Sequence, residues 1–438
     1  KEIVGASEIV KSVSTIFSDN FNPSEIIINA AGNIKAIFDD ESECKRAVLE
    51  FSKIIQQKAY GITISQAVVL FKGDFAQQID INNLERKLKV QRNIISIPLD
   101  LSLNIMKLSP STAKPINSYK KNNDKSSVDK ATRQKLNKYA EIEQDETFKE
   151  LNHISNSKNK IAVIHIDGNG LGQLIPKLEK DFNLKLSDFS SKLNKATTDA
   201  FEKAKKDKKI REIILGGDDL TVICDANHAL SFTREFLHNF EKETEKNFTK
   251  LTACAGIAYT NEKYPFHYAV DLAEALCNES KRHAKIIDEN LAPSCLMFHN
   301  IQSSNYHSWQ KFVDDELTIL NDKQKIHCDF GPYYLSEENK PTIDNFIILA
   351  ESLKLKNSPS SKLRSWLSEL YISDTNAKNY LERIDQISEL NTSYDKEILN
   401  KNFKNLHPSL KLDNLIIENR TPIYDVLQLL SITDTGAN

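Results

Sequence analysis

At 438 residues, the chain is long enough for two or three domains, each with a core of its own. Hydrophobic residues make up 40% and charged residues 27%, a composition typical of soluble globular proteins, and no run approaches the roughly 18 apolar residues of a membrane span. The formal net charge of −3 argues against a uniformly basic nucleic-acid-binding protein but allows a local basic patch. The six cysteines include no CxxC pair, so we expect reduced thiols, a cytoplasmic protein without membrane contact, and no structural zinc.

Residues 1–104 predict a first α+β domain. The segment EIIINAAGNIKAIFDD at 25–40 predicts a hairpin, which a helix at 41–56 and a strand at 62–71 follow. Because the chain begins with Lys1 rather than Met, we expect this domain to be truncated at its start.

A polar, basic linker or helical insertion is expected at 105–155. Its stretch 114–138 contains eight Lys or Arg residues against two Asp residues. One interpretation is a solvated loop or helix. The other is an RNA or partner contact made by phosphate attraction, for which only Tyr119 offers a stacking ring.

The elements of a second domain, at 156–300, follow in a regular order. An apolar run at 161–166, IAVIHI, predicts a strand that leads into the glycine-rich loop DGNGLG at 167–172. A hairpin at 212–225 and a buried strand at 251–260 come later, and apolar residues at helical spacing predict one helix before the hairpin, one between hairpin and strand, and one after the strand. The order β-α-β-β-α-β, followed by a helix, predicts a ferredoxin-like palm.

Three carboxylates are expected to meet in this palm. The end of its first strand and the tip of its central hairpin are neighbours, so Asp167 approaches Asp218 and Asp219 in LGGDDL. Three such groups repel one another unless cations lie between them. Mg²⁺ or Mn²⁺ suits hard oxygen ligands and brings substrate phosphates with it, so the pattern predicts a site for two metal ions that acts on a nucleoside triphosphate.

Glycines surround these acids in both motifs. Gly216 and Gly217 allow a tight turn and a close approach of a nucleotide to the backbone. The loop after the first strand exposes backbone N–H groups to a triphosphate at the start of the next helix. The residues expected to bind nucleotide in this loop are Gly168, Asn169, Gly170, Leu171 and Gly172.

Either motif alone would also suit a surface turn, because Gly and Asp are common turn residues. Their occurrence together, each after an apolar strand, favours a functional site. An internal repeat supports the domain assignment, since residues 25–40 align with residues 211–226. Asn33 then stands where the second copy has Asp219, so we expect the first palm to be degenerate and catalytically inactive, with a packing role or as half of a shared nucleotide site.

Tandem palms with DGNG and GGDD in the second resemble the polymerase/cyclase large subunit of type III CRISPR complexes. The resemblance covers roughly residues 1–100 and 160–300, including KEIVGASEIV at 1–10 and KYPFHYAVDLAEALCNESK at 263–281. The sequence departs from that family in having no HD nuclease domain before the first palm and no paired-cysteine zinc module, so we expect a shortened relative. The resemblance implies Asp167, Asp218 and Asp219 as catalytic, metal-binding carboxylates, the Gly168 carbonyl as a further metal ligand, and Lys281, with Lys285 as a weaker candidate, as phosphate contacts.

Residues 301–438 predict a small, mainly helical C-terminal domain. Two classes of function remain open for the whole chain. The first is a nucleotidyltransferase or cyclase that converts ATP or another NTP into a cyclic or linear oligonucleotide messenger. The second is a non-catalytic scaffold that senses nucleotides or binds RNA and CRISPR-type protein subunits. A diguanylate cyclase is disfavoured because the tip reads Asp-Asp, and a homodimer is one way to supply a second nucleotide surface.

Overall fold

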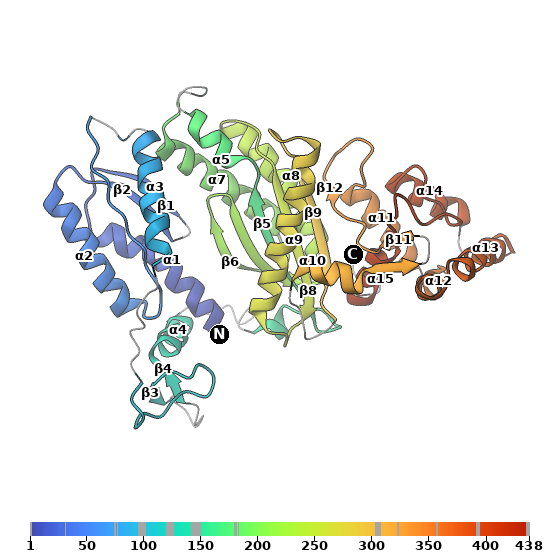
Figure 1. Ribbon diagram of the computed structural model, residues 1–438, viewed down its shortest axis with the longest axis horizontal. Helices are drawn as coiled ribbons and strands as arrows, with labels where there is room; N and C mark the ends of the chain where they lie inside the picture. Colours follow the sequence, from blue (N-terminus) through green and yellow to red (C-terminus); the bar gives the residue numbers. More distant parts are fainter. Residues whose placement is uncertain are drawn as a thin grey trace. The chain divides into compact units, whose positions relative to one another are not determined.

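Two structural units make up the computed structural model, which has a mixed α+β fold (Figure 1). The first contains residues 1–145 and 175–190, and the second contains residues 146–174 and 191–438. The structure describes residues 2–30, 32–73, 76, 78–94, 102–119, 127–141, 150–178, 182, 184–302, 308–321, 324–355, 358–390 and 395–434.

The first unit consists of helices and two short hairpins. Its elements are α1 (Glu2–Asn20), β1 (Glu25–Ala30), β2 (Asn33–Ile37), α2 (Glu41–Lys58), α3 (Gln78–Arg92), β3 (Ile116–Tyr119), β4 (Ser127–Asp129) and α4 (Lys130–Glu141).

The predicted first hairpin is present as the antiparallel pair β1 and β2. Gly32 has φ +75° in its turn, a conformation that glycine adopts without strain. Asp40 then caps α2 by accepting hydrogen bonds from the backbone N–H groups of Ser42 and Glu43. Aromatic and aliphatic side chains of α1 and α2, including Phe17 and Phe51, form the core of this unit.

The segment 62–71 differs from its prediction, because the structure assigns no strand to it. Ile62 and Ile64 pack against the core of the unit. Within the described residues, 63–71 make no backbone hydrogen bond to β2 or to any other strand. The apolar alternation is therefore present, and among the described residues no strand pairs with this segment.

The basic segment 114–138 contributes to β3, β4 and α4. Helix α4 lies directly against α1, since a Cβ added to Gly5 would be only 1.8 Å from the Lys135 carbonyl oxygen. Residues 120–126 and the side chain of Tyr119 lie outside the described part of the chain, so the expected RNA or partner contact stays a prediction.

The second unit is larger and contains the long sheet. Its elements are β5 (Lys160–Gly168), α5 (Leu171–Leu174), most of α7 (Leu186–Lys205), β6 (Ile210–Gly216), β7 (Asp219–Asp225), α8 (Ala229–Asn247), β8 (Ala253–Asn261), α9 (Phe266–Ile287), β9 (Cys295–Asn300), α10 (Trp309–Glu316), β10 (Thr318–Asn321), β11 (Gln324–His327), β12 (Tyr333–Tyr334), α11 (Ile343–Lys354), α12 (Ser360–Ile372), α13 (Asp374–Leu390), α14 (Lys396–Leu406) and α15 (Ile423–Ile432).

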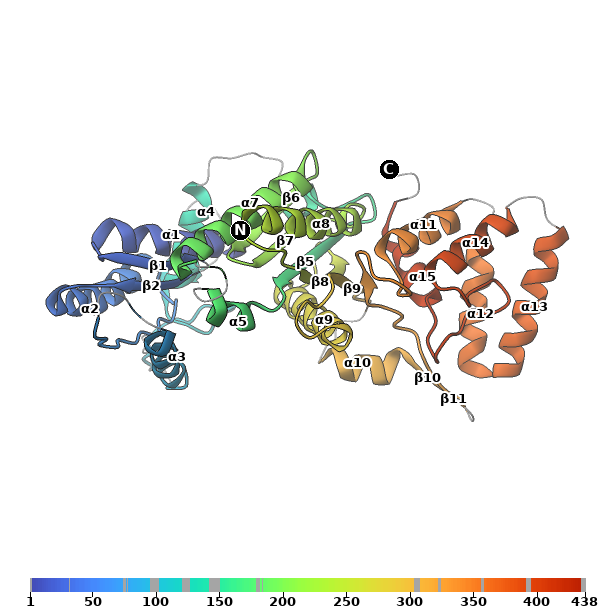
Figure 2. The ribbon, with the colours of Figure 1, turned by 90° about the horizontal axis from the view of Figure 1, so that it is seen from above.

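The long sheet has the strand order β12-β9-β8-β5-β7-β6. Its central strand β5 pairs antiparallel with both β7 and β8. Figure 2 shows α8 on one side of this sheet and α9 on the other. With both faces covered, β5 reads as a continuous apolar run, and Ile161 to Ile164 are fully or almost fully buried.

Two strands extend the sheet beyond the predicted palm. Strand β9 is parallel to β8, and the short β12 pairs with β9. The C-terminal region after β12 is helical, as predicted, and Trp366 is buried in it. All six cysteines are free thiols. No helix in the described ranges is both long enough and apolar enough to span a bilayer.

Candidate functional site

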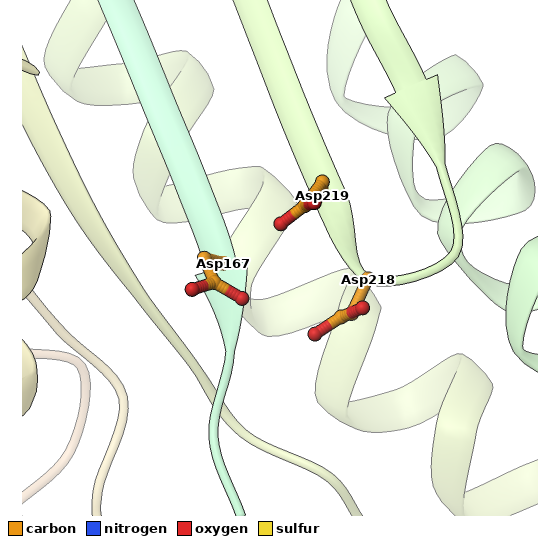
Figure 3. Close-up of side chains that lie close together, drawn as sticks. All are labelled: Asp167, Asp218 and Asp219. Carbon is orange, nitrogen blue, oxygen red and sulfur yellow. The ribbon is translucent and has the colours of Figure 1, made fainter. Parts of the chain in front are cut away.

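The three predicted carboxylates meet at one end of the sheet. Asp167 is the penultimate residue of β5, Asp219 begins β7, and Asp218 lies in the turn that joins β6 to β7. Figure 3 shows their side chains gathered around one space. One carboxylate oxygen from each lies within 4.8 Å of the other two, so the ferredoxin-like strand order produces the juxtaposition that the sequence predicts.

Glycine is required at position 168 because Asp218 lies against it. A Cβ added to Gly168 would be 2.9 Å from both the Cβ and the Oδ2 of Asp218, closer than real Cβ contacts allow. The end of β5 can therefore approach the hairpin tip only without a side chain.

The hairpin tip is held by α7 as well as by its own turn. Gly217 has φ +65°, so a larger residue there would be strained. The Thr197 hydroxyl donates a 2.6 Å hydrogen bond to the Gly217 carbonyl oxygen, and the Gly217 N–H donates to the side-chain oxygen of Asn194 at 3.4 Å. These contacts fix the backbone beside the two hairpin acids.

Burial and mutual repulsion make these acids hard to ionise. Burial first, and then the charges of Asp219 and Asp167, raise the pKa of Asp218 to about 7. Burial followed by the charge of Asp167 raises the pKa of Asp219 to about 6. A cation bound between them would relieve both effects.

Lys281 is the cationic side chain of α9 that reaches this cluster. Its ammonium group pairs with the Asp167 carboxylate and donates a 2.8 Å hydrogen bond to the Gly168 carbonyl oxygen. The helix can come this close because β8 carries Gly256, where an added Cβ would be 2.0 Å from the Ala273 carbonyl oxygen. The predicted phosphate contact thus lies beside the predicted metal ligands.

The glycine-rich loop is anchored by Asn169, which sequence reasoning assigned to nucleotide binding. The side chain is buried, and its Nδ2 donates to the Thr252 hydroxyl at 3.1 Å and to the Ala292 carbonyl at 3.3 Å. Its backbone N–H is also occupied by the Thr252 carbonyl oxygen at 2.8 Å. Asn169 therefore holds the loop on β8.

The rest of the loop leaves its backbone accessible. Gly170 has φ +74°, and a Cβ added to Gly172 would meet open space. Leu171 begins α5, a single turn of helix. Gly216 ends β6 opposite Asp219. Lys285 is exposed one helical turn beyond Lys281, and no ion pair to it is found in the described part of the chain.

Sequence reasoning missed one charge near the site. Glu274 adds negative charge that raises the pKa of Asp219. Glu274 lies two helical turns before Lys281 on the same face of α9. This spacing in the sequence could have indicated that both side chains are near the site. His165 is half-buried, with its Nδ1 3.0 Å from the Thr221 hydroxyl, and burial lowers its pKa.

The donors at this site suit a hard divalent cation. Three carboxylates and the neighbouring Gly168 carbonyl offer oxygen atoms, which Mg²⁺ and Mn²⁺ prefer as ligands. The described residues contain no other group of three acidic, histidine or cysteine side chains close enough to hold a metal ion. Burial, and after it the neighbouring carboxylates, raises the pKa of Asp218 and of Asp219, and a bound cation would oppose both effects.

Comparisons with known proteins find one family model and several solved structures that are similar to the chain. Residues 160–287 match the family model described as Cas10/Cmr2, second palm domain. No curated protein matches the chain. Similar solved structures include the Csm1–Csm4 cassette in complex with cA4 (13% identity, TM-score 0.49, 98% of this chain and 66% of that one).

Two further solved structures are similar to the chain. The first is the Csm1–Csm4 cassette in complex with AMPPNP, with 13% identity and a TM-score of 0.48 over 98% of this chain and 64% of that chain. The second is Csm1 in T. onnurineus, with 14% identity and a TM-score of 0.43 over 97% of this chain and 63% of that chain. The chain spans less than two thirds of the length of each of these solved chains. The family match confirms the resemblance drawn from DGNG and GGDD, since residues 160–287 match the model of the Cas10/Cmr2 second palm domain.

Proposed function

We propose that this palm is a metal-dependent nucleotidyltransferase or cyclase. It converts ATP, or another NTP, into a cyclic or linear oligonucleotide messenger with release of pyrophosphate, in antiviral signalling of the CRISPR type. The observation that carries the proposal is the cluster of Asp167, Asp218 and Asp219, whose carboxylates lie within 4.8 Å of one another. A protein that only binds partners gains nothing from this repulsion.

Asp167, Asp218, Asp219 and the Gly168 carbonyl would hold two Mg²⁺ or Mn²⁺ ions. When bound, such ions lower the pKa of an attacking hydroxyl and neutralise charge on departing pyrophosphate. Lys281 lies beside these ligands and would contact a phosphate oxygen, with Lys285 farther out. The backbone of Gly170, Leu171 and Gly172 would bind the triphosphate, with the loop held in place by Asn169.

The reaction is a substitution at the α-phosphorus of the NTP. The oxygen of a ribose hydroxyl on a second nucleotide forms a bond to that phosphorus, and the bond from phosphorus to the bridging oxygen of pyrophosphate breaks. The hydroxyl proton passes to solvent, so no protein general base is required. The ordered carboxylates and Lys281 position the reacting groups and balance the charge that develops.

Mass spectrometry of reaction products tests the proposal. The chain is incubated with each NTP and either Mg²⁺ or Mn²⁺, beside the double variant Asp218→Asn/Asp219→Asn and the control Asp207→Asn, which changes an exposed acid in the loop after α7. We expect an oligonucleotide and pyrophosphate from the wild type and the control, and neither from the double variant.

A pyrophosphate assay separates this function from the scaffold alternative. Both functions allow ATP with Mg²⁺ to raise the melting temperature, but only the enzyme releases pyrophosphate. Because a palm site of this kind faces one nucleotide, a cyclic product requires a second nucleotide-binding surface. We propose the first palm or a second protomer as its source, and RNA or CRISPR-type protein subunits as partners that are added to the same assay.

A further inference from the structure

A second row of side chains lies behind the acid cluster on the same face of the long sheet. His165 of β5 lies opposite Thr221 of β7. The first comes two residues before Asp167, and the second two residues after Asp219. Side chains two residues apart on a strand share a face and lie about 7 Å apart along it. The His165 Nδ1 is 3.0 Å from the Thr221 hydroxyl, and its Nε2 has no hydrogen-bond partner among the described residues.

The second row extends across the sheet from helix α9 to the edge strand β6. On β8 it includes Gly256, which pairs with His165. Helix α9 crosses the sheet at this point, because a Cβ added to Gly256 would be 2.0 Å from the Ala273 carbonyl oxygen. On β6 the row includes Ile214, which pairs with Thr221 and is 44% exposed. The row therefore combines polar groups with an accessible apolar side chain.

Glu274, the residue after Ala273 on α9, is the acidic side chain near this row. Burial lowers the pKa of His165, and Glu274 is the foremost charge that opposes this shift. Its charge also adds to burial and to Asp167 in raising the pKa of Asp219. Glu274 is exposed and makes no ion pair or hydrogen bond with another described residue. An unpaired carboxylate is thus available beside both the acid cluster and the second row.

The direction of the proposed reaction brings a substrate over the second row. Pyrophosphate leaves toward the loop 168–172, which the proposed function assigns to the triphosphate and which follows the end of β5. The attacking oxygen approaches the α-phosphorus from the opposite side, because displacement at phosphorus is in line. Seen from the acids, the opposite side is the sheet face that carries His165 and Thr221.

We propose that His165, Glu274 and Ile214 form a subsite for the nucleoside part of the acceptor nucleotide, the one whose hydroxyl attacks. The Glu274 carboxylate accepts a hydrogen bond from a ribose O–H or a base N–H group, and the His165 Nε2 makes a second hydrogen bond. Ile214 contacts the ribose or base through its exposed apolar surface. The inference rests on the proposed function and names a substrate contact of that same site.

Binding of adenosine tests the subsite without turnover. Adenosine has a ribose and a base but no phosphate, so it lacks the groups that the glycine-rich loop would bind. Saturation-transfer NMR in Mg²⁺ compares the wild type with Glu274→Ala, His165→Ala and the control Asp271→Ala, which removes an exposed acid one turn earlier on α9. We expect each of the first two variants to weaken binding by about fivefold or more. The control should change it by less than about twofold.

Three analogues identify the group that Glu274 contacts. 2′-Deoxyadenosine and 3′-deoxyadenosine each lack one ribose hydroxyl, and inosine lacks the amino group of adenine. The analogue without the contacted group should bind the wild type as weakly as adenosine binds Glu274→Ala, and should lose no further affinity in that variant. Undiminished binding of all three analogues would overturn the proposal.

Kinetics with a separate donor and acceptor show whether the subsite serves the reaction. 2′,3′-Dideoxy-ATP can only donate, because it has no ribose hydroxyl that attacks, and adenosine can only accept, because it has no triphosphate. Each turnover joins an adenosine hydroxyl oxygen to the α-phosphorus and releases pyrophosphate. We expect Glu274→Ala to raise the KM for adenosine by about fivefold or more and to leave the KM for dideoxy-ATP within about twofold.

Failure of the subsite differs from failure of the proposed function. A wild type that binds adenosine through Glu274 but releases no pyrophosphate would support the subsite and contradict the proposed function. Pyrophosphate release by the wild type, with equal adenosine binding by Glu274→Ala and Asp271→Ala, would overturn the subsite alone. An equal rise in both KM values would also overturn it, because Glu274 would then act through Asp219 and the metal ions.

Discussion

At the scale of single residues, the fold holds three carboxylates close together although their charges repel one another. Asp218 and Asp219 are held side by side at a hairpin tip, and Asp167 faces them from β5. Lys281 balances part of the charge through Asp167. The arrangement is therefore less favourable without a cation than with one, and substitutions that remove charge should show this directly.

Replacing one acid should separate stability from metal binding. We expect Asp218→Asn to raise the melting temperature of the metal-free protein, because it removes one repelling carboxylate from a buried cluster. The same change should weaken Mn²⁺ binding by about tenfold or more. Differential scanning fluorimetry with and without Mn²⁺ measures both effects, and Asp207→Asn should change neither. A lower metal-free melting temperature in Asp218→Asn would contradict the repulsion argument.

The raised pKa values also predict a pH dependence. Ionisation of Asp218 and Asp219, with pKa values of about 7 and about 6, is disfavoured in the folded metal-free chain. Their unfolded values are near 3.9, so they should make the metal-free protein lose stability as pH rises from about 4 through 7. Protons and metal compete for the same oxygens, so Mn²⁺ affinity should increase from pH 5.5 to pH 8. Calorimetric titration across this range checks the trend, which should be flatter in Asp218→Asn.

At the scale of elements, two close approaches build the site. Gly168 lets the end of β5 meet the β6–β7 turn, and Gly256 lets α9 pack on β8 and carry Lys281 to Asp167. Neither glycine contributes a side chain to the chemistry. Each glycine allows a neighbouring element to pack closer to the strand than the Cβ of any other residue would permit.

Two glycine substitutions, one at the end of β5 and one at the start of α5, test this geometry. Gly168→Ala places a Cβ 2.9 Å from Asp218, so the hairpin tip must shift, at a cost of about 1–3 kcal/mol in unfolding free energy. We expect Mn²⁺ affinity and pyrophosphate release to fall together. In Gly172→Ala the added Cβ meets no protein atom within 4 Å, so Mn²⁺ affinity and the unfolding free energy should change little, the affinity by less than about twofold. Urea unfolding and the metal titration are the measurements. An unaffected metal site in Gly168→Ala would show that the tip does not depend on this contact.

The same elements show how far the sequence alone could lead. The acid cluster followed from apolar runs that end at DGNG and GGDD, because strand order determines which strand ends are neighbours. The inward role of Asn169 was not predictable, since its partners Thr252 and Ala292 are distant in sequence. Strand β9 was missed although Pro293 and Ser294 precede CLMFHN, because a six-residue apolar run fits a buried strand and a segment of buried helix equally well.

At the scale of the whole chain, the two units differ in what they contain. The second unit carries clustered carboxylates, and the first contains a cavity of about 580 Å³. Within the described residues, the two units share a hairpin and the helix after it, and a strand between the hairpin and its neighbour is seen only in the second unit. In the second unit this strand is β5, which supplies Asp167, so the acid cluster depends on β5 lying beside β7.

Metal binding should therefore stabilise one part of the chain more than the other. A ligand stabilises the cooperative region that contains its site, and hydrogen exchange reports that region locally. We expect Mn²⁺ to slow exchange in the loop after β5 and in the β6–β7 turn, and to leave β1 and β2 of the first unit unchanged. Asp218→Asn should abolish this protection. Equal protection of β2 by Mn²⁺ would mean that the two units are energetically coupled.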